Sequence, residues 1–163
     1  MTVYRTLQIW VKKGHRMHPY FQDMCQCAKN MHNTTNFYIR QVFTALQQEK
    51  ELQPLQKEVL KSLQIHLPAI NANQLQAYQR RYAKEQEKAK SEQKEIQCHL
   101  FEMPSKDKPY ISYPFLNALF KSMKQTDYQS LPIQSSQGIM RTVFQNWKAF
   151  YGSIHTIFSY SVI

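Results

Sequence analysis

The spacing of apolar residues restricts this chain to a mainly helical fold. From residue 21 to residue 46, apolar or small residues recur in alternating steps of three and four, which is typical of one stripe along a helix. The members of this stripe are Phe21, Met24, Ala28, Met31, Thr35, Tyr38, Val42 and Leu46. The pattern predicts one long helix, or two helices with a break near Asn33–Thr35.

A second stripe predicts another helix directly afterwards. It consists of Leu52, Leu55, Val59, Leu63 and Leu67. Pro68 is expected to end this helix, because its nitrogen carries no hydrogen for the next backbone bond. Asn71 can then cap a third helix that carries Leu75, Tyr78 and Tyr82.

Polar and proline-rich segments come next. Between residues 83 and 95 alanine is the only apolar residue, and four lysines balance four glutamates. Residues 83–97 are therefore expected to form a solvated helix or frayed chain. Residues 101–113 are expected to be a linker, because the segment FEMPSKDKPYISYP contains three prolines.

Two helices are expected after this linker. Pro114 suits the first turn of a short helix, PFLNALFKSM, and Pro132 suits the first turn of a longer one. The polar segment QTDYQS is expected to be a break between them. One face of the last helix carries Met140, Val143, Phe144, Trp147, Phe150 and Tyr151. Gly152 is expected to end it.

The N-terminus differs from the rest of the chain. Residues 3–13 alternate, include aromatic and β-branched side chains and end at Gly14, which predicts one β-strand. The expected fold class is therefore mainly α, with four to five helices and one N-terminal strand. The chain has 163 residues, which suits one domain, and neither a secretory pattern nor an 18-residue apolar run is present. A soluble cytoplasmic protein is expected.

Patterns of catalytic and metal-binding residues are scarce. Only three aspartates occur (Asp23, Asp107 and Asp127), whereas a metal-dependent nuclease needs several carboxylates around one or two cations. Cys25 and Cys27 would point in very different directions on a helix, so they do not suit a shared zinc ion. With only three glycines the chain has no glycine-rich phosphate loop. The sequence therefore predicts no catalytic residue, no metal site and no cofactor in this chain.

The charge of the chain favours a polyanionic partner. The net charge is +10 and the pI is about 9.6. Phosphate contacts are expected from Lys12, Lys13, Lys29, Arg40, Arg141 and Lys148. Glutamine, asparagine and tyrosine side chains can add contacts to base edges. The same spacing also fits solvated charges around a helical core, so spacing alone leaves both interpretations open.

Three stretches resemble the N-terminal half of the TnpB (OrfB) proteins of insertion sequences, RNA-guided nucleases related to type V CRISPR effectors. The first, CAKNMHNTTNFYIRQVF, is similar to an early helix of that family. The second, YISYPFLNALFKSMKQTDYQSLP, is similar to its loop and short helix before a Tyr-x-x-Leu-Pro step. The third, LPIQSSQGIMRTVFQNWKAF, matches Leu-Pro, Gln, a basic residue and Trp-Lys-x-Phe, and is the most specific of the three.

The resemblance implies a β-barrel wedge region interrupted by a helical recognition lobe. Residues 1–14 would then be the first strand of an incomplete wedge, and residues 15–153 the recognition lobe. In the family this half holds guide RNA and target DNA and reads a short duplex motif beside the target, while the guide supplies most of the specificity. The motif-reading positions would be Tyr113, Asn117, Gln134 and Gln137. Gln137 is the leading candidate, because a glutamine amide can pair with adenine through two hydrogen bonds.

The chain also departs from that family. It ends GSIHTIFSYSVI, so residues 154–163 are not similar to the family, and neither the catalytic carboxylates nor the zinc-ribbon Cys-x-x-Cys pairs are present. A truncated or frameshifted transposase product is therefore expected, a monomer that binds DNA and guide-type RNA near the nucleoid and is not an enzyme. The alternatives are a stand-alone DNA- or RNA-binding regulator, a plain helical interaction module, or a nuclease completed by a second polypeptide.

Overall fold

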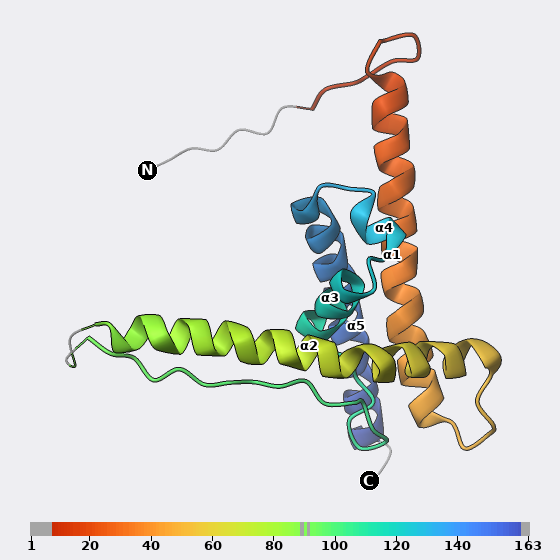
Figure 1. Ribbon diagram of the computed structural model, residues 1–163. Coiled ribbons are helices and arrows are strands. Elements are labelled where there is room, and N and C mark those ends of the chain that lie inside the picture. The colour runs from red at the N-terminus through yellow and green to blue at the C-terminus, as the bar shows by residue number, and fades with distance from the viewer. Residues whose placement is uncertain (1–7, 89, 91, 161–163) are drawn as a thin grey trace.

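The computed structural model describes residues 8–88, 90 and 92–160, with side chains up to Ser153. These residues contain five helices and no β-strand, which confirms the expected mainly α fold. The helices are α1 (His18–Gln47), α2 (Pro54–Gln86), α3 (Tyr113–Ser122), α4 (Thr126–Gln129) and α5 (Ile133–Tyr160). Figure 1 shows α1 and α5 side by side, α2 crossing α1 near its C-terminal end, and α3 between α2 and α5.

The pair of long helices α1 and α5 forms the frame of the molecule. Helix α1 is continuous, and Thr35 is fully buried within it, its hydroxyl donating to the Met31 carbonyl oxygen at 2.8 Å. The indole Nε1 of Trp147 donates to Oδ1 of Asn36 at 2.8 Å, and further along both helices the Phe43 and Tyr151 ring centroids are 5.2 Å apart. Because contacts advance in the same direction along both helices, α1 and α5 run parallel.

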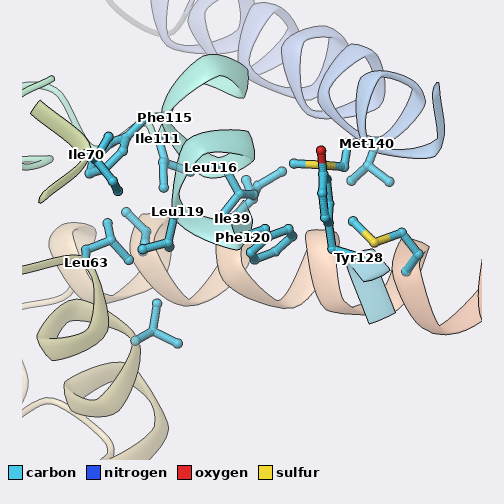
Figure 2. Packing of buried hydrophobic residues seen from close by; sticks show 14 of the residues in the cluster. Ile39, Leu63, Ile70, Ile111, Phe115, Leu116, Leu119, Phe120, Tyr128 and Met140 are labelled. Carbon is cyan, nitrogen blue, oxygen red and sulfur yellow. The ribbon is translucent and has the colours of Figure 1, made fainter. Parts of the chain in front are cut away.

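The hydrophobic core is built around α3. Leu116, Leu119 and Phe120 are fully buried, and Phe115 is 3% exposed. Figure 2 shows these side chains meeting apolar residues from α1, α2 and α5, among them Ile39, Leu63 and Met140. Burying one such side chain contributes about 1.5–3 kcal/mol, so α3 supplies a large share of the stability.

The sequence at the start of α3 explains where this helix begins. The backbone N–H of Phe115 donates to Oγ of Ser112 at 3.4 Å, which is the bond of an N-cap serine. Pro114 lies in the first turn, as its position in the sequence predicts, because no backbone donor is needed there.

An aromatic cluster packs around the middle of α5. Its members are Phe43 of α1, Tyr110 of the segment before α3, and Trp147, Phe150 and Tyr151 of α5. The Tyr110 and Tyr151 ring centroids are only 4.4 Å apart. Burial raises the pKa of the Tyr151 hydroxyl, with a smaller effect from Tyr110.

The expected end of the second helix at Pro68 is wrong. Helix α2 continues through Pro68 to Gln86, and the expected third helix is its second half. Leu63 and Ile70 are buried on either side of the proline, so packing holds both halves in one helix. Asn71 is not an N-cap: its Nδ2 donates to the Phe101 carbonyl oxygen at 2.9 Å and its Oδ1 accepts the Phe101 N–H at 2.8 Å.

The solvated helix expected over residues 83–97 also needs correction, because α2 ends at Gln86. The carboxylate of Glu85 accepts from Lys88 Nζ at 2.8 Å and from the Lys94 backbone N–H at 2.9 Å. These bonds hold a reversal of the chain and lower the pKa of Glu85, the Lys88 bond most strongly. The irregular segment 93–112, which includes most of the expected linker 101–113, then returns beside α2 (Figure 1).

The two ends of the chain complete the fold. Part of the strand expected over residues 3–13 lies outside the described residues, and residues 8–12 form neither helix nor strand. Gly14 has a φ of 93°, which suits glycine in the turn before α1. The expected end of α5 at Gly152 is wrong: the helix passes through it to Tyr160, and Gly152 does not have the positive φ of a terminating glycine. The backbone of 154–160 therefore continues this helix.

Replacing Pro68 by alanine is expected to stabilise the protein. A proline inside a helix removes one backbone hydrogen bond and crowds the preceding turn, so Pro68→Ala should raise the free energy of unfolding by about 1–3 kcal/mol. Urea denaturation followed by circular dichroism at 222 nm measures this. Pro54→Ala is the matched control, because Pro54 is at the first position of α2, where its missing N–H costs little. Equal effects of the two variants would contradict the continuous helix.

Candidate nucleic-acid interface

Six of the predicted contact residues share one face of the molecule, formed by α3 and α5. Tyr113 and Asn117 are four residues apart on α3, and the others follow on α5 at intervals of three, four and seven residues, which keeps them on one side of that helix. We call this surface the α3–α5 face. It consists of Tyr113, Asn117, Gln134, Gln137, Arg141 and Lys148.

A short chain of hydrogen bonds joins the two helices at this face. Nε2 of Gln137 donates to the Tyr128 hydroxyl at 3.3 Å, and that hydroxyl donates to Oδ1 of Asn117 at 2.9 Å. Tyr128 belongs to α4 and is 5% exposed, so its ring is fixed by the core while its hydroxyl reaches the two amides. The Tyr128 hydroxyl thereby holds the amides of Asn117 and Gln137, both predicted to read bases, in defined orientations.

A hollow with a cationic rim lies further along the face. It has a volume of about 380 Å³ and is lined by Tyr113, Arg141, Phe144, Gln145 and Lys148. The Arg141 guanidinium carbon is 5.5 Å from the centre of the Tyr113 ring, a cation–π arrangement, and Phe144 meets the same ring edge-to-face at 5.7 Å. No lining residue is acidic, so both cations remain available to an anion.

The importance of Tyr128 is missed by reasoning from the sequence, which treats QTDYQS as a polar break. The structure instead forms the short helix α4 there, with Oε1 of Gln125 accepting the Tyr128 N–H at 2.7 Å. Asp127 is used for packing: it accepts from the Thr34 hydroxyl of α1 at 2.6 Å and from Gln125 Nε2 at 3.0 Å. The single aromatic residue in an otherwise polar segment is the signal that points to a buried anchor.

The remaining predicted cations lie apart from the α3–α5 face. Lys12 and Lys13 precede α1, whose N-terminal end extends beyond the other helices (Figure 1), and Lys29 follows in the first half of α1. Lys13 lines a separate hollow of about 440 Å³ beside Phe21 and Cys25. Arg40 is exposed further along α1. The structure thus brings together six of the ten predicted residues and leaves four on another part of the surface.

The described residues form no metal-binding cluster and no helix that could span a membrane. Residues 8–88, 90 and 92–160 contain no group of three or more His, Cys, Asp or Glu side chains that could hold a metal ion. All three cysteines are free thiols, and Cys25 is exposed. No helix in the described part of the chain is sufficiently long and apolar to span a membrane.

Comparison with known proteins adds no assignment. No protein-family model matches the chain, and no curated protein or solved structure is significantly similar to it. The resemblance to TnpB proteins therefore stays a prediction that rests on the three quoted stretches, and functional conclusions depend on the geometry of the α3–α5 face.

Removing the Tyr128 hydroxyl should loosen this face without unfolding the protein. In Tyr128→Phe, Asn117 and Gln137 both lose their shared partner, and the free energy of unfolding should fall by about 0.5–1.5 kcal/mol. Chemical denaturation gives the loss, and NMR of side-chain amides should show shifts for Asn117 and Gln137. Tyr20→Phe is the control, because Tyr20 is 53% exposed at the start of α1. Unchanged amide signals in Tyr128→Phe would show that the bridge is absent in solution.

Proposed function

We propose that this chain is a nucleic-acid-binding lobe similar to the recognition lobe of TnpB proteins. It holds duplex DNA or structured RNA on the α3–α5 face. The observation that carries this proposal is the convergence of residues predicted from separate stretches, Tyr113 and Asn117 on one helix and four residues on another. Their chemistry also suits a nucleic acid, because amides, an aromatic ring and unpaired cations occur together.

Each part of the face has a distinct role in this proposal. Arg141 and Lys148 contact phosphates and supply affinity that does not depend on sequence. Gln137 reads a base: a glutamine amide has two N–H donors and one carbonyl acceptor, so the bond to Tyr128 leaves a donor and the acceptor for an adenine. Because Tyr128 holds the amide in place, little ordering is needed when the base binds.

The proposed activity is binding without cleavage. Hydrolysis of a phosphodiester in the related nucleases depends on carboxylates that hold divalent cations, and we assign no such group to this chain. Cleavage would require a second polypeptide that supplies these carboxylates. The face described above would then act as the part that positions the nucleic acid.

Loss of one phosphate contact should weaken binding to every sequence. For Arg141→Ala we expect an affinity several-fold lower at 100 mM salt, and a slope of log K against log salt smaller by about 0.9 for duplex DNA. Fluorescence anisotropy with labelled duplex and hairpin RNA, titrated with salt, measures both values. Lys61→Ala is the matched control, because Lys61 is an exposed cation on α2 outside the face. Equal losses in both variants would mean that only overall charge matters.

Removing the Gln137 amide should reduce the selectivity between sequences, whereas removing Arg141 should weaken binding to every sequence. For Gln137→Ala we expect discrimination between duplex sequences to fall by about 1–3 kcal/mol, with the salt dependence unchanged. A library of randomised duplexes, selected by wild type and variant in parallel, measures this. Should the folded wild-type protein bind neither DNA nor RNA at low salt, the proposed function is wrong.

A further inference from the structure

A polar cleft lies between α3 and α2, next to the α3–α5 face. Its volume is about 430 Å³, within the range of small-molecule sites. Helix α3 contributes side chains from three successive turns, Tyr113, Asn117 and Lys121, together with Pro114, Ala118 and Ser122. Helix α2 contributes Ile70, Asn73 and Gln74.

The chemistry of this lining selects a restricted class of ligand. Asn73, Gln74 and Asn117 offer amide donors and acceptors, and Asn117 keeps its Nδ2 for a ligand because its Oδ1 is taken by Tyr128. The buried Ile70 and the Tyr113 ring provide apolar surface. No carboxylate lines the cleft, which disfavours a cationic ligand, and Lys121 adds one positive charge.

These properties together fit a nucleotide. A base is planar, has several hydrogen-bonding groups on its edge and stacks on aromatic rings, and its phosphate needs a cation. Ser122 is less available, because its Oγ lies 3.0 Å from Nδ1 of His66. In a complex with a nucleotide, the amides of Asn73 and Gln74 would face the base edge and Lys121 would meet the phosphate.

The cleft is continuous with the α3–α5 face, because Tyr113 and Asn117 belong to both. Tyr113 lines both the α2–α3 cleft and the hollow that contains Arg141 and Lys148. A strand whose phosphates follow Arg141 and Lys148 therefore reaches the cleft across a single aromatic ring. We infer that the α2–α3 cleft receives one unpaired nucleotide from the nucleic acid held on the α3–α5 face, an inference that rests on the proposed function.

The test compares two probes that differ in one base. Both probes share one short hairpin stem. In the first probe the stem is fully paired, and in the second it carries a single bulged 2-aminopurine. We expect the bulged hairpin to bind roughly tenfold more tightly, because stacking of one base on an aromatic ring contributes that much. The 2-aminopurine fluorescence should also change when the protein binds.

Two variants locate the effect in the cleft. Ala118→Met fills the space and Asn73→Ala removes an amide, and each should abolish most of the preference for the bulge while leaving binding of the paired hairpin unchanged. Gln79→Ala is the control, because Gln79 is an exposed amide on α2 outside the cleft. Asn73 is itself exposed, so its replacement keeps the test valid even if Ala118→Met fails to fold.

The outcomes separate this inference from the proposed function. Preference for the bulge that both variants remove supports the cleft. Binding of the paired hairpin with no preference for the bulge, or a preference that Asn73→Ala leaves intact, overturns the cleft alone. Failure of the wild type to bind either hairpin overturns the proposed function as well.

Discussion

The burial of α3 is the constraint on which the rest of the structure depends. Ten residues long, this helix is too short to be stable alone, so its apolar side chains must be covered from several directions. Leu116, Leu119 and Phe120 have no exposed surface because α1, α2 and α5 all pack near them (Figure 2). The polar side of α3 is thereby fixed between α2 and α5, and its residues Tyr113 and Asn117 contribute both to the α2–α3 cleft and to the α3–α5 face.

Core and candidate site consequently share residues. The Tyr128 ring lies 6.3 Å from Phe120 in the core, while its hydroxyl bridges Asn117 and Gln137 at the surface. Tyr113 likewise packs on Phe144 and carries the Arg141 guanidinium. Because the polar groups are oriented by buried rings, a ligand would meet a preformed surface, and little of its binding free energy would be lost to ordering side chains.

The spacing of apolar residues correctly predicted helices whose buried side chains recur every three or four residues. The stripe on α1 and the apolar face of α5 are of this kind: Met31, Val42, Met140 and Val143 are all buried as expected. Helix ends were predicted less well, because they depend on distant partners. Pro68 does not stop α2, since packing on both sides of it outweighs one missing bond.

The candidate site was predictable only in part, for a related reason. A resemblance to known motifs suggested Asn117 and Gln137 as separate positions, yet neither spacing nor composition indicates that they share one hydrogen-bonding partner. That partner, Tyr128, is supplied by a four-residue helix within a segment that looks like a polar break. A single buried ring leaves no periodic signal: the sequence indicates an anchor only through one aromatic residue in a polar segment, and the two amides that its hydroxyl contacts are identified by the tertiary structure.

The distribution of groups along α5 suggests how affinity and selectivity would be divided. Gln134 and Gln137 occupy its first turns beside α4, whereas Arg141 and Lys148 follow on later turns beside Tyr113. Cations bind any phosphate backbone, while amides distinguish one base edge from another. A nucleic acid lying along α5 would therefore be held at one end and read at the other. Tyr113 lines both the cationic hollow and the α2–α3 cleft, so one aromatic ring joins the phosphate-binding end of this face to the polar cleft.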